Sequence, residues 1–114
     1  MAQNLSFNVR IKIFGIEGDK KHAFGKGTAM LLRGITVHHS LNKAAKEMGM
    51  AYSKAWKSIN ATEEYLGIKL IERQAQRGST LTEDGLQLLQ IYEDAEKAAA
   101  AAALNVFQNS GFDF

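Results

Sequence analysis

Side chains with the chemistry to contact a nucleic acid are grouped on one predicted helix, over residues 51–66. If Ala55 and Ile59 turn toward the core, the opposite face of that helix carries Tyr52, Ser53, Trp56, Lys57 and Asn60. Hydroxyl, amide and lysine donors near the start of a helix can hydrogen-bond with base edges in the major groove, and aromatic rings can contact thymine methyl groups or sugars. This face therefore predicts contact with double-stranded DNA.

Basic residues flank this helix on both sides in the sequence. Lys43 and Lys46 lie on the preceding predicted helix, while Arg73 and Arg77 lie in a predicted hairpin that follows. Each of them alone is more often a solvated surface charge, but cations on both sides of a groove-reading helix can contact phosphates. The expected DNA-binding residues are Lys43, Tyr52, Ser53, Lys54, Trp56, Lys57, Asn60, Arg73 and Arg77.

The predicted helix and the one before it meet three requirements of a helix-turn-helix. The motif needs a small residue where its two helices cross, a residue that tolerates positive φ in the turn, and apolar residues that hold the second helix. Ala45 meets the first and Gly49 the second, while the third is met by Met50, Ala55 and Ile59. An ordinary helical hairpin without a role in nucleic-acid binding is the alternative, but a face exposed only to solvent rarely carries two aromatic rings beside a lysine.

The N-terminal part of the chain is expected to form a strand and a short hairpin partner. Over residues 7–14 the side chains alternate, which is typical of a half-buried strand. The apolar face carries Phe7, Val9, Ile11 and Ile13, and the other face carries Arg10 and Lys12. The Gly18-Asp19 dipeptide is a turn signal, so a second strand is predicted over 22–24.

Two predicted helices precede the one that carries the polar face. The first is expected to start from an N-cap at Thr28 and to run to about His38, and the second covers 41–48 after an N-cap at Ser40. After the third helix, residues 68–73 predict a strand, 74–78 a turn and 79–81 a returning strand. That hairpin is the expected wing of a winged helix-turn-helix, a mainly α fold with a small amount of β structure.

A long last helix is predicted over 83–108, with Thr82 as its N-cap. Its apolar stripe is expected to include Leu86, Leu89, Tyr92, Ala99 and Ala103. The six alanines over 98–103 strongly favour a helix, and their small side chains let two helices approach closely. We therefore expect a homodimer that packs through this helix.

Length and composition indicate a single winged helix-turn-helix domain over 1–114. The net charge of +2 conceals an asymmetry, because residues 1–42 and 43–77 carry +4 and +3 while residues 78–114 carry −5. With no cysteine and no apolar run long enough to cross a bilayer, the chain is expected in the cytoplasm and not in a membrane. The three histidines do not have a metal-ligand spacing, and no cofactor or enzymatic activity is predicted.

Several segments in order resemble the DNA-binding domain of the ModE-like molybdate-responsive transcriptional regulators, which is itself similar to the LysR-type winged helix. The matching segments are Val9 to Ile13, Phe24 to Gly27, Leu31-Leu32, Ser40 to Met50, Tyr52 to Trp56, Leu70 to Arg73 and Leu81 to Gly85. The resemblance implies a recognition helix over 52–66, a wing tip over 73–80, a last helix that takes part in a dimer interface, and binding to a palindromic operator.

Three departures from this family bear on what the resemblance implies. Ala51 replaces the usual capping serine at the start of the recognition helix, and the wing over 74–79 is shorter and poorer in glycine. Members of the family continue into a molybdate-binding domain whereas this chain stops after its last helix, so oxyanion binding is not expected.

The sequence therefore predicts a dimeric transcriptional regulator that binds specific double-stranded DNA. The alternative is a winged-helix module that binds a protein partner through the alanine-rich helix and does not contact DNA.

Overall fold

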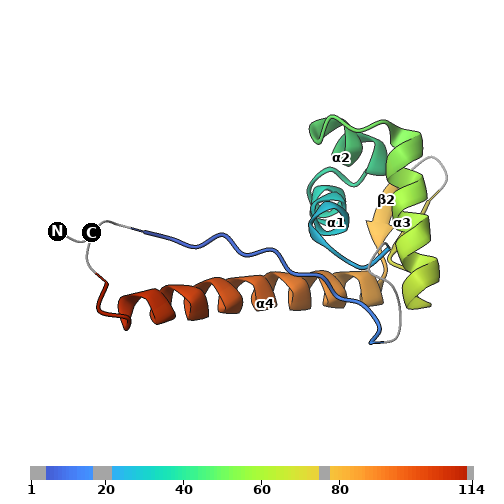
Figure 1. Ribbon diagram of the computed structural model, residues 1–114. Coiled ribbons are helices and arrows are strands. Elements are labelled where there is room, and N and C mark those ends of the chain that lie inside the picture. Colours follow the sequence, from blue (N-terminus) through green and yellow to red (C-terminus); the bar gives the residue numbers. More distant parts are fainter. Residues whose placement is uncertain (1–4, 17–21, 75–77, 113–114) are drawn as a thin grey trace.

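A computed structural model of the chain describes residues 5–16, 22–74 and 78–112. The described residues form α1 (Lys26–His38), α2 (Leu41–Glu47), α3 (Tyr52–Leu66), β1 (Ile71–Arg73), β2 (Ser79–Leu81) and α4 (Glu83–Gln108). Helices α1 to α3 and the hairpin gather at one end of α4, which extends well beyond them (Figure 1). The expected mainly α fold with a small β hairpin is confirmed.

The hydrophobic core is formed by α1, α2, α3 and the start of α4. Leu31, Leu32 and Ile35 of α1 are almost completely buried together with Leu89 and Tyr92 of α4. A Cβ added at Gly34 of α1 would lie 2.7 Å from that of Ala44 in α2, so only glycine allows the two helices to pack this closely. Burial of this apolar surface is the main force that holds α1 and α2 to α4.

Helix α1 begins earlier than the sequence predicted. Its first residue is Lys26 and its N-cap is Gly25, which has an extended backbone and no side-chain cap. Thr28, the predicted N-cap, lies inside the helix and is buried. That assignment was wrong because the extended backbone at Gly25 allows the helix to begin at Lys26, two residues after the fully buried Phe24.

The predicted N-terminal strand and its hairpin are replaced by an extended segment. Its burial does alternate, with Val9, Ile11 and Ile13 half-buried and the residues between them exposed. Its backbone pairing in the described residues is a single isolated bridge, in which the N–H groups of Ile13 and Phe24 donate to each other's carbonyl oxygens over 2.8 and 2.9 Å. Since α1 starts two residues after Phe24, residues 22–24 do not form the predicted second strand, and the N-terminal segment runs along α4 instead (Figure 1). The Gly18-Asp19 turn lies outside the described residues.

Helix α4 starts at Glu83, as predicted. The Thr82 hydroxyl accepts a hydrogen bond from the Gly85 N–H over 2.9 Å, and Glu83 and Asp84 lie in the first turn, where the helix dipole favours negative charge. The predicted stripe was wrong at Leu86, which is 52% exposed. Gly85 faces inward instead, and only glycine fits there, because a Cβ would lie 2.1 Å from the Leu70 carbonyl oxygen.

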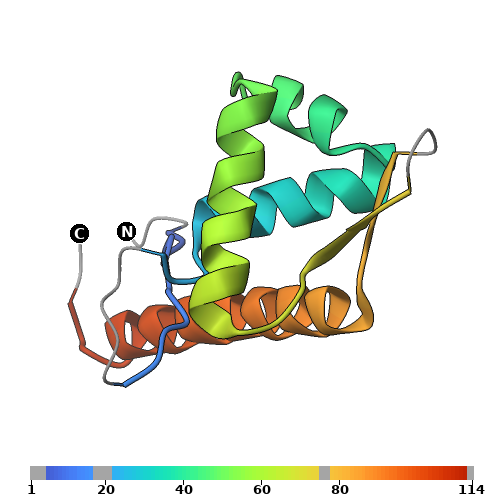
Figure 2. The ribbon, with the colours of Figure 1, turned by 90° about the vertical axis from the view of Figure 1, so that its right-hand side faces the viewer.

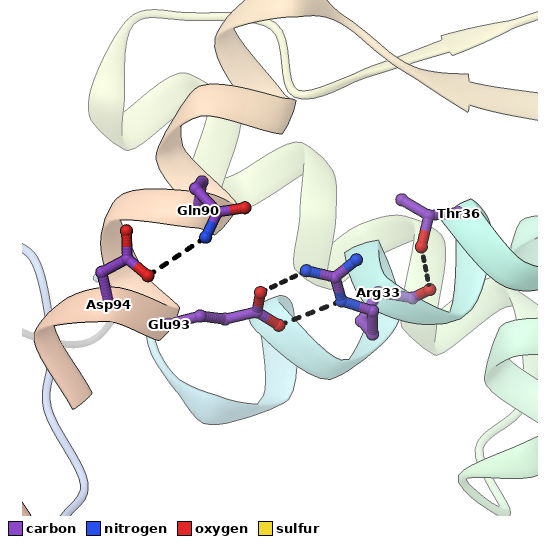
Figure 3. Close-up of polar contacts among 5 residues, drawn as sticks. All are labelled: Arg33, Thr36, Gln90, Glu93 and Asp94. Atoms are coloured by element: carbon purple, nitrogen blue, oxygen red, sulfur yellow. Dashed lines mark hydrogen bonds and ion pairs between the residues drawn. The ribbon is translucent and has the colours of Figure 1, made fainter. Parts of the chain in front are cut away.

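Polar contacts join the first half of α4 to α1. Arg33 donates two hydrogen bonds to the carboxylate of Glu93 (Figure 3), and Lys26 lies 3.6 Å from Glu96 in an ion pair. The ring of Phe24 meets that of Tyr92 edge-on, with centroids 5.5 Å apart. These contacts fix the start of α4 against α1.

The second half of α4 has far less contact with the helices of the same chain. After Tyr92, none of its described residues is buried, and the alanines over 98–103 are exposed or half-buried. Its neighbour there is the N-terminal segment, where the Phe7 ring lies 6.3 Å from that of Phe107. None of the helices formed by the described residues is long and apolar enough to span a membrane.

Candidate nucleic-acid interface

A short turn joins α2 to α3 and has the features expected of a helix-turn-helix. Ser40 caps α2 by accepting a hydrogen bond from the Lys43 N–H over 3.1 Å. Gly49 has a φ of +66°, as its place in the turn requires, and the next N–H, that of Met50, donates to the Ala45 carbonyl oxygen over 2.9 Å. Ala45 is fully buried. The predicted roles of the glycine and the small residue agree with this geometry.

Helix α3 is held at its back by buried side chains. Ala55, Ile59 and Thr62 are at most 3% exposed, so the other side of the helix faces solvent. Ala51 precedes the helix without a side-chain cap, in agreement with the absence of the usual serine. Most of the face predicted for DNA is therefore open to solvent, and the described chain borders it only at Tyr52 and Trp56, where Arg73 lies against the two rings.

The predicted contact residues of α3 occupy two adjacent faces and not one. Ser53, Lys54 and Lys57 are exposed, and Asn60 is half-buried. Tyr52 and Trp56 are 43% and 37% exposed and border the hairpin. Neighbouring residues of a helix are about 100° apart around its axis, so Trp56 faces the hairpin while Lys57 faces outward.

The hairpin of β1 and β2, called the wing below, lies beside α3 (Figure 2). Its antiparallel register pairs Ile71 with Leu81 and Arg73 with Ser79. The predicted first strand over 68–73 was too long, since residues 68–70 form no ladder. Their polar groups bond elsewhere: the Leu70 carbonyl accepts from the Thr82 N–H and the Lys69 carbonyl accepts from the Thr82 hydroxyl.

A buried carboxylate joins α3 to the base of the wing. Glu63 is 7% exposed, and its Oε2 accepts hydrogen bonds from the N–H groups of Leu70 (2.7 Å) and Ile71 (3.2 Å). Lys69 Nζ lies 3.7 Å from its Oε1. Glu63 was not among the predicted site residues, although its position four residues after the buried Ile59 places it on the inner side of the helix.

The far end of the wing is fixed against the turn between α1 and α2. The Ser79 N–H donates to the carbonyl oxygen of His39 over 3.0 Å. Gly78 has a φ of +90°, and a Cβ at this position would lie 2.1 Å from the same oxygen. Only glycine combines this backbone conformation with such a close approach.

Arg73 lies against the aromatic residues of α3. The centre of its guanidinium is 4.7 Å from the ring centroid of Trp56 and 5.8 Å from that of Tyr52. One hollow of about 570 Å³ opens between Trp56, Asn60 and Arg73, and a second of about 530 Å³ between Asn42, Tyr52 and Arg73. Arg73 therefore borders both hollows.

Two of the predicted DNA contacts, Lys43 and Arg77, belong to other parts of the chain. Lys43 is exposed in the first turn of α2, which Ser40 caps. Arg77 lies outside the described residues, so its predicted contact with DNA is untested. Within the described ranges, no group of three or more His, Asp or Glu side chains is placed to hold a metal ion.

Comparison with known proteins places this arrangement among bacterial regulators. Residues 30–86, half of the chain, match the family described as bacterial regulatory helix-turn-helix protein, lysR family. Over 67 residues the chain is 33% identical to the DNA-binding transcriptional dual regulator ModE of Escherichia coli K12 and equally to the transcriptional regulator ModE of Shigella flexneri. The match covers 55% of this chain but only 26% of each ModE protein.

Solved structures share the fold. The CbnR DBD–DNA complex matches 71% of this chain and 92% of its own chain, with a TM-score of 0.59 and 21% identity. The BenM DBD/benA site 1 DNA complex matches 75% of this chain and 96% of its own, with a TM-score of 0.57 and 22% identity.

Proposed function

This chain belongs to the LysR family of bacterial regulatory helix-turn-helix proteins, and on that basis we propose that it regulates transcription by binding specific sequences in double-stranded DNA. The ModE relatives are named as transcriptional regulators, and the CbnR and BenM structures contain DNA. The observation that carries the proposal is the solvent face of α3, which is open in this chain and rich in hydrogen-bond donors beside the wing. We expect the protein to act in the cytoplasm, where the bacterial chromosome lies.

In the proposed complex, α3 enters the major groove. Ser53, Lys57 and Asn60 extend from it toward base edges, where hydroxyl, ammonium and amide groups can hydrogen-bond. Lys43 and Lys54 lie beside this face and contact phosphates, and the same role is proposed for Arg77, which follows β1 in the sequence. The basic charge of residues 43–77 supports this orientation, because DNA attracts a cationic face.

We also propose that the protein acts as a homodimer through α4. The second half of this helix, after Tyr92, has no buried residue among those described, although it carries apolar side chains such as Val106, which is 73% exposed. Its alanines allow a second helix to approach closely. A dimer would present two α3 helices to successive major grooves about 34–36 Å apart, which requires a palindromic operator.

Titration of a labelled duplex by fluorescence anisotropy tests DNA binding. If Lys43, Lys54 and Arg77 each neutralise one phosphate, the logarithm of affinity should fall with the logarithm of salt concentration with a slope of about −2.7 per protomer. That slope corresponds to a loss of roughly 40-fold between about 50 and 200 mM salt. Selection from a random duplex library then gives the preferred sequence.

Binding that is absent or insensitive to salt would contradict the proposal. It would favour the second class of function, a winged-helix module that binds a protein through the open half of α4. Analytical ultracentrifugation tests the dimer separately, because a monomer at micromolar concentration would refute assembly through α4 without bearing on DNA contact by α3.

A further inference from the structure

The contact between Arg73 and two aromatic rings gives this residue a role that its position in the sequence does not suggest. Arg73 is the last residue of β1, opposite Ser79, at the point where the wing leaves its two-stranded ladder. Its guanidinium lies over Trp56 at 4.7 Å and beside Tyr52 at 5.8 Å, and both rings belong to the first two turns of α3. One wing residue therefore contacts two residues of the proposed recognition helix.

We propose that Arg73 is a positioning residue for DNA binding: it holds the wing and the recognition helix as one unit, and its role is not that of a phosphate contact. This inference rests on the proposed function, since it concerns how the α3 surface is prepared for DNA.

The wing needs such a contact because its own ladder is short. Each strand has three residues, and an isolated two-stranded hairpin is at best marginally stable in water. Glu63 fixes the base of β1, and the Ser79 N–H fixes the start of β2 on His39. Arg73 supplies a third attachment, on the side of the wing that faces α3.

Arginine suits this position better than lysine. Its guanidinium is planar and can stack on an aromatic face, and tryptophan is the ring that attracts cations most strongly. A lysine would keep the positive charge but lose the flat contact. The contact also restricts the orientations of the Trp56 and Tyr52 rings. DNA then binds a surface that is already ordered, so less conformational entropy is lost on binding.

Charge and shape can be separated by two substitutions. In Arg73→Lys the charge remains and the stack is lost, whereas in Arg73→Gln both are lost. We expect both variants to weaken duplex binding about three- to tenfold, which is the effect expected when a cation stacked on an aromatic ring is lost. The salt dependence of Arg73→Lys should equal that of the unchanged protein, because the number of cations is the same.

The coupling to Trp56 can be tested in the same assay. If Arg73 acts through this ring, the loss caused by Arg73→Lys should become much smaller in a Trp56→Leu background, since residues that act together are not additive.

The free protein gives a readout that needs no DNA. Trp56 is the single tryptophan of the chain, so its fluorescence reports on this contact alone. Without the guanidinium over the ring, acrylamide should quench the emission more strongly in Arg73→Lys and Arg73→Gln. Lys46→Gln, which removes an exposed charge from α2, is the matched control and should leave the quenching unchanged. Far-UV circular dichroism shows that each variant has kept its helices.

The outcomes separate the inference from the proposed function. Stronger quenching in both variants, together with weak binding that lysine does not restore, supports the positioning role. Arg73→Lys that binds like the unchanged protein overturns it, whatever the quenching shows, and so does unchanged quenching. If the unchanged protein fails to bind any duplex while the quenching responds as expected, the stack is present but the proposed function, and the role built on it, are refuted.

Discussion

Replacing Glu63 with alanine is expected to loosen the wing from α3 and to lower the free energy of unfolding by roughly 3 kcal/mol. The carboxylate accepts hydrogen bonds from two backbone N–H groups, those of Leu70 at 2.7 Å and Ile71 at 3.2 Å. A hydrogen bond to a charged group contributes about 1.5–3 kcal/mol. We take the lower value for both, because the second bond is long and only partly buried.

Two further variants make this expectation specific. Glu63→Gln keeps an oxygen that can accept but loses the charge, so each bond falls to about 1 kcal/mol and the loss of stability should be near 1 kcal/mol. Glu64→Ala is the matched control, because the neighbouring glutamate is exposed. Its effect should stay within about 0.5 kcal/mol.

Urea denaturation measures these differences. Circular dichroism follows the helices and Trp56 fluorescence follows the surface between α3 and the wing, and coincident transitions would establish two-state unfolding. If the alanine variant at Glu63 is no less stable than the one at Glu64, the carboxylate does not hold the wing and the reasoning fails.

Three more predictions follow from other contacts. Lys54→Gln should leave stability unchanged, because the side chain is exposed, and reduce the steepness of the salt dependence of DNA binding by about one unit per protomer. Gly78→Ala should destabilise the chain by more than about 2 kcal/mol and weaken DNA binding, because its Cβ would overlap the His39 carbonyl oxygen. Burial, and then the hydrogen bond to Glu96, raise the pKa of Tyr92 to about 12. Stability should therefore hold below about pH 10 and fall by about 2 kcal/mol between about pH 10 and 12, where only the unfolded tyrosine loses its proton.

Each of these has a measurement that can contradict it. An unchanged salt slope in Lys54→Gln would remove this lysine from the phosphate contacts. Gly78→Ala that unfolds at the same urea concentration as the unchanged protein would show that the wing does not depend on its close approach to His39. For Tyr92 the comparison is Tyr92→Phe, which cannot ionise. Equal loss of stability above pH 10 in both proteins would assign the effect to other groups.

The helix-turn-helix could be predicted from the sequence because its signals are local. The hydroxyls of Ser40 and Thr82 bond with the backbone three residues further along, and Gly49 and Gly67 adopt positive φ at the ends of their segments. Each of these features depends on a few consecutive residues. The helical spacing of Ala55 and Ile59 likewise fixes which side of α3 is buried.

The N-terminal strand was predicted wrongly for a related reason. Alternation shows which side chains of residues 7–14 turn inward; this part was right for Val9, Ile11 and Ile13 and wrong for Phe7, which is 38% exposed. It does not show whether a partner strand exists. That depends on the start of α1, which directly follows the bridge between Ile13 and Phe24.

The sequence by itself determined the winged helix-turn-helix fold, which helix has an exposed face, and that this part of the chain is positively charged. Tertiary structure decided how the wing is attached: through Glu63 at its base, through Gly78 against His39, and through Arg73 on Trp56. These contacts join residues 7, 39 and 17 positions apart in the chain, respectively. No local pattern specifies such pairs, because their geometry exists only after the core has placed α1, α3 and the wing side by side.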